Sequence, residues 1–219
     1  MNSADHLQAA KLALIPVFSE IDTQIKENLQ KVLTAFRNHR VGAHHFASVT
    51  GYGHGDLGRE VLDRVFAEVM GAEAAAVRVQ FVSGTHAIAC ALYGILRPGD
   101  ELLAVAGAPY DTLEEVIGLR GQHQGSLAEF GVQYRQLHLT EDGSVDWETL
   151  ASAIKPQTRM VLIQRSCGYS WRSSLAIAEI EKIIHLVKHQ NPDTVCFVDN
   201  CYGEFIETCE PTAVGADLM

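Results

Sequence analysis

Positive charge is scarce in this sequence. The 219 residues include 17 lysines and arginines against 27 aspartates and glutamates, so the formal net charge at pH 7 is −10. Nucleic acids and anionic membrane surfaces are bound through clustered Lys and Arg side chains. We therefore expect no nucleic acid and no membrane as a partner, and we interpret the acidity as a source of solubility.

The cysteines form no metal-binding or redox pattern. The sequence has five, with no CxxC pair, and we predict no metal site. An odd number of cysteines in a chain that is 47% apolar is typical of a reducing cytosol. No apolar stretch is long enough to span a membrane, and the N-terminus lacks the basic and apolar regions of a signal peptide. These features predict a cytoplasmic location.

The first part of the chain reads as helix. Residues 5–38 are predicted helical with a break near Pro16, after which Ser19 is a candidate cap. An apolar stripe then packs on the body of the domain or on a partner subunit; it consists of Ile21, Ile25, Leu29, Val32, Leu33 and Phe36.

Residues 41–58 are rich in glycine and predict an irregular loop. Tyr52, His54 and Arg59 lie on or beside this loop and are capable of chemistry. Long glycine-rich loops often carry function. A flexible connector is the alternative interpretation.

From residue 59 onward, helical and strand patterns alternate. A helix over 59–70, with Leu62, Val65, Phe66 and Val69 facing inward, precedes repeated βα units. Such units predict an α/β fold with a mostly parallel central sheet and helices on both faces. The expected strands are 75–82, 101–106, 132–139, 159–164 and 194–199, and the expected helices are 85–96, 111–119, 146–154 and 175–190.

Two polar groups follow predicted strands at the edge where such sheets bind ligands. Ser83, Gly84 and Thr85 form a turn before a helix of small residues, and a helix N-terminus favours phosphate. Asp199 ends the last strand, where a carboxylate can hold a cationic ring nitrogen. The alternatives are a plain helix cap for the turn and a turn-capping role for Asp199.

Three motifs together resemble a known family. They are Gly51-Tyr-Gly-His-Gly-Asp-Leu-Gly-Arg59, Val82-Ser-Gly-Thr-His-Ala-Ile88 and Asp199-Asn-Cys-Tyr-Gly-Glu-Phe205. They are similar to motifs of the methionine gamma-lyase-like or cystathionine beta-lyase-like group, often labelled aluminium-resistance proteins. The resemblance extends along essentially the whole chain. It implies a pyridoxal-phosphate enzyme of the aspartate-aminotransferase fold, fold type I.

The resemblance also implies roles for individual residues. Ser83, Gly84 and Thr85 hold the phosphate of pyridoxal 5′-phosphate, and Asp199 pairs with its pyridine nitrogen. Tyr110 stacks on the ring, a contact worth about 1 kcal/mol; a surface turn tyrosine is the alternative.

A second group of implied roles is less specific. Tyr52 and Arg59 reach the phosphate of a neighbouring subunit, or Arg59 pairs with an acidic residue of its own helix. Arg165 or Arg172 holds a substrate carboxylate, or both are solvated or structural. His86 lies close to the cofactor or is a satisfied helix histidine.

The chain departs from the family in one respect. The family binds its cofactor as a Schiff base to a lysine on a later strand, and no lysine follows Lys188. We therefore expect no catalytic residue within the chain and place the Schiff-base lysine beyond Met219. The predicted domains are the N-terminal helices and glycine-rich loop, 1–58, and an incomplete, truncated large domain that binds the cofactor, 59–219.

The resulting hypothesis is a pyridoxal-phosphate-dependent carbon–sulfur lyase. It acts on a sulfur-containing amino acid by β- or γ-elimination and forms a homodimer or homotetramer. One alternative is a truncated, non-catalytic remnant or interaction subunit, and the 219 residues alone are expected to be inactive. Another is an aminotransferase, or a desulfurase that uses Cys201 or Cys167.

Overall fold

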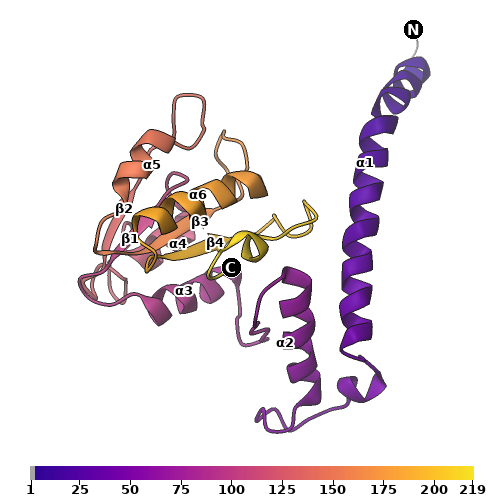
Figure 1. Ribbon diagram of the computed structural model, residues 1–219, viewed down its shortest axis with the longest axis horizontal. Helices are drawn as coiled ribbons and strands as arrows, with labels where there is room; N and C mark the ends of the chain where they lie inside the picture. Colours follow the sequence, from indigo (N-terminus) through magenta and orange to yellow (C-terminus); the bar gives the residue numbers. More distant parts are fainter. Residues whose placement is uncertain (1–2) are drawn as a thin grey trace. The chain divides into compact units, whose positions relative to one another are not determined.

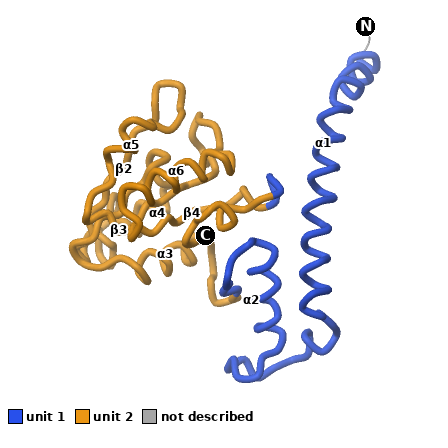
Figure 2. Tube along the Cα trace, viewed as in Figure 1, with its two compact units in different colours: residues 1–77, 205–208 blue, residues 78–204, 209–219 orange. Residues whose placement is uncertain are grey.

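The structure is a computed structural model that describes residues 3–219, and its chain divides into two compact units. The first comprises residues 3–77 and 205–208, and the second comprises residues 78–204 and 209–219 (Figure 2). The domain division after residue 58 remains a prediction.

The first unit begins with one long helix, α1 (Ser3–Asn38). It runs through Pro16 without interruption, so the predicted break is wrong. Proline removes one hydrogen bond from a helix, and here the carbonyl that loses its donor belongs to Leu12, a residue that is 58% exposed. Within residues 3–219, no helix combines the length and the apolar character needed to cross a membrane.

Helix α2 (Leu57–Met70) follows a short 3-10 turn, η1 (Ala43–Phe46), and an irregular glycine-rich segment. The loop and the helix were both predicted, but the buried face of the helix was partly wrong. Leu62 and Phe66 are 38% and 40% exposed. The small core of this unit instead contains Ala35 of α1 with Val61, Val65 and Val69 of α2.

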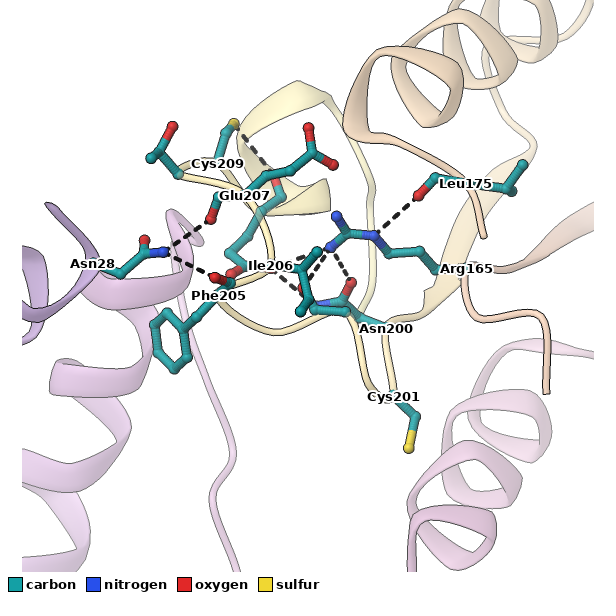
Figure 3. A network of polar contacts seen from close by, with 12 residues as sticks. Asn28, Arg165, Leu175, Asn200, Cys201, Phe205, Ile206, Glu207 and Cys209 are labelled. Carbon is teal, nitrogen blue, oxygen red and sulfur yellow. Dashed lines mark hydrogen bonds and ion pairs between the residues drawn. The ribbon is translucent and has the colours of Figure 1, made fainter. Parts of the chain in front are cut away.

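Helix α1 also holds a separate piece of chain, residues 205–208. Gln24 and Asn28 donate hydrogen bonds to the first carbonyl of this segment at 2.9 and 3.0 Å, and Lys31 donates to the last at 2.9 Å. These three side chains lie on one face of α1 because their spacing matches the helical repeat. The segment is therefore bound through its backbone, as seen at Asn28 in Figure 3.

The second unit is built on a four-stranded sheet in the order β2-β1-β3-β4, with every neighbouring pair parallel (Figure 1). This confirms the predicted α/β fold. The strands are β1 (Glu101–Ala104), β2 (Gln133–Gln136), β3 (Thr158–Gln164) and β4 (Val195–Asp199).

Helices cover both faces of this sheet, as predicted, because consecutive residues of a strand point to opposite faces. On one face Leu102 and Leu162 pack with α3 and α4. On the other, Leu103 and Ile163 pack with α5 and α6. These helices are α3 (Gly84–Ile95), α4 (Asp111–Ile117), α5 (Trp147–Ala153) and α6 (Ile177–Gln190).

The predicted strand over residues 75–82 is wrong. Its apolar residues suggested burial, yet Val79 is 90% and Val82 is 82% exposed. A turn also interrupts it, where the Phe81 N–H donates to the Arg78 carbonyl at 3.2 Å. A strand requires a hydrogen-bonded neighbour, and within residues 3–219 this segment has no such ladder.

The outer edge of β4 is also paired. After a second 3-10 turn, η2 (Pro211–Val214), Leu218 forms a parallel bridge with Phe197, and its carbonyl accepts from the Val198 N–H at 2.9 Å. Strand β4 is therefore flanked on both sides where it approaches Asp199.

Candidate functional site

The N-terminus of α3 forms one side of the carboxyl edge of the sheet. Ser83 is its N-cap, and the Ser83 hydroxyl accepts from the His86 N–H at 3.1 Å. A Cβ added to Gly84 would meet no atom within 4 Å. The capping alternative is thus observed for Ser83, and it leaves an open, electropositive helix end of the kind that binds phosphate.

His86 has a local role. Its Nδ1 accepts from the Val82 N–H at 3.3 Å, and its ring contacts Phe81 edge-on with centroids 5.9 Å apart. These contacts favour the satisfied helix histidine over a residue that touches a cofactor.

Tyr110 lies among Thr85, Gln164 and Asp199 at the carboxyl edge of the sheet. Its hydroxyl donates to the Thr85 hydroxyl at 3.3 Å, and Thr85 is 3.1 Å from the Thr112 hydroxyl. Burial raises the pKa of Tyr110, the bond with Thr85 opposes this, and the charge of Asp199 adds to the rise. Tyr110 is therefore a neutral, half-buried residue beside Thr85 and Asp199 rather than a free surface tyrosine.

Asp199 ends β4 and is only 8% exposed. Its carboxylate accepts from the Cys201 N–H at 3.1 Å. Burial raises the pKa of Asp199, the Cys201 hydrogen bond opposes this, and the negative charge of Glu204 adds to the rise. A cation placed beside this carboxylate would reverse the shift, so Asp199 fits a protonated ring nitrogen.

Gln164 was not identified from the sequence. It ends β3 next to Asp199 and is 9% exposed. Its amide oxygen accepts from the Tyr110 N–H at 3.1 Å, and its amide nitrogen donates to Ser166 at 3.3 Å. Gln164 therefore ties the loop before α4 to the sheet. The available signal was a polar residue that closes an otherwise apolar strand.

The two candidate substrate-binding arginines bind the protein itself. Arg165 is 3% exposed and Nη1 donates to the Asn200 side chain at 2.9 Å. Arg172 donates to the carbonyls of Gln164 and Ser173 at 3.0 and 2.9 Å. These contacts support the structural alternative for both.

Tyr52 and Arg59 belong to the first unit. Tyr52 is 86% exposed. The Arg59 Nε lies 3.6 Å from the carboxylate of Asp56, which caps the same helix. Gly53 has a φ of +79°, and a Cβ there would lie 2.6 Å from Arg59 Nη1. The pairing of Arg59 within its own helix is thus observed, and the role of both residues at a cofactor phosphate stays a prediction.

The last two lysines of the sequence both lie on α6 with other partners. Lys182 stacks over the Trp147 ring at 3.7 Å, and Lys188 pairs with Asp217 at 2.7 Å. Neither is therefore a candidate for a cofactor-bound lysine.

An open parallel sheet with a helix N-terminus, an aromatic side chain and a buried carboxylate at its carboxyl edge defines a ligand-binding α/β protein. The family model for methionine gamma-lyase matches residues 3–219. The chain belongs to the methionine gamma-lyase family, which confirms the resemblance found in its motifs.

Several relatives are similar over nearly the whole chain. YnbB of Bacillus subtilis, described as uncharacterized, is 50% identical over 204 residues, which are 93% of this chain and 48% of YnbB. A Listeria innocua structure, provisionally a cystathionine beta-lyase involved in aluminium resistance, is 45% identical with a TM-score of 0.95 and covers 100% of this chain and 54% of its own.

A Clostridium novyi structure, described as a carbon-sulfur lyase involved in aluminium resistance, is 45% identical with a TM-score of 0.91. The match covers 96% of this chain and 51% of that structure. The chain thus spans about half the length of these relatives.

Proposed function

We propose that the intact protein is a pyridoxal-phosphate-dependent carbon–sulfur lyase that acts on a sulfur-containing amino acid by β- or γ-elimination. The observation that carries the proposal is the buried carboxylate of Asp199 at the same sheet edge as Tyr110 and the N-terminus of α3. Membership of the methionine gamma-lyase family supports the type of chemistry.

The first part of α3 binds the cofactor phosphate in this proposal. Its backbone N–H groups point out of the helix end, and the helix dipole favours a dianion there. The absence of a side chain at Gly84 leaves room for a close approach. Thr85 is held by Tyr110, so the hydroxyl beside the phosphate is fixed in place. In the same proposal, the Tyr110 ring would stack on the ring of the bound cofactor.

Asp199 acts on the pyridine nitrogen. When bound, the cofactor supplies an electron sink for the electron pair that remains on Cα after its proton is removed. The Asp199 carboxylate keeps the ring nitrogen protonated, and the Cys201 N–H keeps that carboxylate oriented. Burial of Asp199 strengthens the pairing because the local dielectric is low.

We assign proton transfer at the substrate carbons to a lysine in the part of the relatives' length that this chain does not cover. The proposal includes a homodimer or homotetramer in which Tyr52 and Arg59 serve the phosphate of a neighbouring subunit. Cys201 is a poor candidate for a desulfurase nucleophile. Cys201 is an exposed residue, but partial desolvation and the negative charges of Asp199 and Glu204 raise the pKa of its thiol, which disfavours the reactive thiolate.

The test uses the protein purified from its native source. Borohydride reduction followed by intact-mass analysis should show a pyridoxyl adduct, and peptide mapping should locate it on a lysine. With methionine or cystathionine as substrate, the protein should release a thiol, ammonia and a 2-oxo acid. Amino-group transfer without thiol release would indicate an aminotransferase. Absence of both an adduct and turnover would indicate the non-catalytic alternative.

A further inference from the structure

Arg165 is the first residue after β3 and is tied to Asp199 through the backbone. The Arg165 N–H donates to the Asp199 carbonyl at 3.0 Å. This bond continues the ladder one residue beyond the pair formed by Gln164 and Asp199. The backbone of Arg165 is thus hydrogen-bonded directly to the end of β4.

The Arg165 side chain also closes the loop that follows Asp199. Its Nε donates to the Leu175 carbonyl at 3.2 Å, and Nη1 donates to the Asn200 side chain at 2.9 Å and the Gly203 carbonyl at 2.7 Å (Figure 3). Glu210 lies 3.9 Å from Nη1 and accepts from the Asn200 amide at 2.9 Å. The two ends of loop 200–210 therefore meet at one guanidinium.

The loop backbone is packed against this group without spare room. A Cβ added to Gly203 would lie 2.5 Å from both Arg165 Cδ and Asn200 Oδ1. Tyr202 and Phe205, on either side, have positive φ values of 66° and 61°. Non-glycine residues keep this conformation where their surroundings fix it. Here the Arg165 network holds the loop at Gly203, and Gln24 and Asn28 hold the carbonyl of Phe205.

The network is almost completely buried: Arg165 is 3%, Asn200 6% and Glu210 1% exposed. A buried ion pair adds little net stability, because desolvation offsets the attraction between its charges, but such pairs can specify one conformation. The conformation specified here includes the Cys201 N–H, which follows Asn200 directly and donates to the Asp199 carboxylate.

We propose that Arg165 is a positioning residue for Asp199, acting through Asn200, Gly203 and Glu210 to fix the turn that orients the Asp199 carboxylate. The proposal rests on the proposed function, because that function gives Asp199 its role at a ring nitrogen. It replaces the idea that Arg165 binds a substrate carboxylate, since the guanidinium is buried and bonded to the protein.

The principal variant is Arg165→Lys in the intact protein. Lysine keeps the positive charge beside Glu210 but cannot reproduce the fork that reaches Leu175, Asn200 and Gly203 together. The matched control is Arg135→Lys. Arg135 also forms a fork with a buried carboxylate, Glu101, at 2.9 and 3.0 Å, but at the opposite, amino end of β1.

The first readout needs no cofactor. Hydrogen–deuterium exchange, followed by mass spectrometry, should rise at least about tenfold in peptides that span residues 199–205 in Arg165→Lys. Arg135→Lys should leave these peptides unchanged. An unchanged exchange rate in Arg165→Lys would overturn the proposal, whether or not the protein binds a cofactor.

The second readout is titration with pyridoxal phosphate, followed by absorbance. Arg165→Lys should weaken binding about tenfold, the lower end of what loss of a supporting partner costs at other ligand sites. It should also move the pH midpoint of the cofactor absorbance, whereas Arg135→Lys should do neither. Higher exchange with normal binding and absorbance would overturn the link to Asp199. Failure of the unaltered protein to bind would instead count against the proposed function.

A second variant tests the proposal independently, in case Arg165→Lys fails to fold. Gly203→Ala changes no charge, and its methyl group would push Asn200 away from Arg165. It should raise exchange and weaken binding in the same way. Gly94→Ala is the control, because a Cβ at Gly94 meets nothing within 4 Å. Equal behaviour of the two alanine variants would contradict the proposal.

Discussion

Asp199, the residue proposed to pair with the cofactor ring, is expected to lower the stability of the cofactor-free protein at neutral pH. Burial raises its pKa in the folded protein above the value of about 3.9 for an unfolded chain. The folded state therefore binds the Asp199 proton more tightly than the unfolded state. The contribution of Asp199 to folding becomes less favourable as pH rises from the unfolded pKa through the folded pKa.

We predict that Asp199→Asn makes the cofactor-free protein more stable at pH 7. The amide is neutral, and its oxygen can still accept from the Cys201 N–H. The gain should disappear near pH 3, where Asp199 is protonated in both states, and urea unfolding at the two pH values measures it. Asp146→Asn is the control and should not make the protein more stable at pH 7. Hydrogen bonds from Thr149 lower the pKa of the Asp146 carboxyl, so its charged form is favoured in the folded state. A less stable Asp199→Asn variant at pH 7 would contradict the argument.

The rule that ligands bind at the carboxyl ends of parallel strands pointed to Ser83, Thr85 and Asp199, and the family resemblance pointed to Tyr110. Within residues 3–219 the strand expected before Ser83 is absent, but Thr85 and Tyr110 do contact each other, and the cofactor roles of all four residues stay predictions made from the sequence. The sequence did not identify Gln164 or the buried environment of Arg165. Gln164 contacts Tyr110, and Arg165 contacts Asn200. Such contacts depend on how separate strands are aligned, and no local pattern encodes that alignment.

At the scale of elements, the start of α3 has an observed helix cap at Ser83 and a proposed role at the cofactor phosphate. Ser83→Ala removes the bond to the His86 N–H and should lower the free energy of unfolding by about 1 kcal/mol, with or without cofactor. Ser83→Asp preserves the cap and suits the helix dipole, but its charge should repel a phosphate. Urea unfolding and cofactor titration of both variants separate the cap from the proposed role. Normal cofactor binding by Ser83→Asp would argue against phosphate at this helix end.

Helix and strand predictions failed where the outcome depended on neighbours. Pro16 does not interrupt α1, because the helix is exposed there and water can solvate the freed carbonyl. Residues 75–82 have the composition of a buried strand but pair with no strand of residues 3–219. The βα alternation from residue 84 onward succeeded because the apolar strands β1, β3 and β4 do lie between two helical layers, whereas β2 is polar and partly exposed.

At the scale of the molecule, the sheet separates two apolar cores. Ile117→Val on one side and Ile180→Val on the other should each cost about 0.5–1.5 kcal/mol. Their effects should add to within about 0.5 kcal/mol, because the side chains share no contacts. Ile163→Val with Ile180→Val, both in one core, is the comparison pair and should depart from additivity. Strong coupling across the sheet in urea unfolding would contradict this division.

The apolar stripe of α1 bears on the proposed oligomer. Ile25 and Leu29 are 56% and 54% exposed within the described residues. Contiguous exposed apolar side chains of this kind often mark a surface that binds another protein. We predict that Ile25→Glu with Leu29→Glu lowers the mass of the intact protein in light scattering. Lys26→Glu, on the polar side, should not. A protein that is monomeric before any substitution would contradict the homo-oligomer itself.

The closed loop after Asp199 has an evolutionary consequence. Arg165, Asn200, Gly203 and Glu210 depend on one another so closely that a single change leaves either a buried charge without its counterpart or a clash. Mutational paths through this part of the family should therefore be narrow. Among related sequences we expect these positions to be inherited as a set and, where they differ, to differ together.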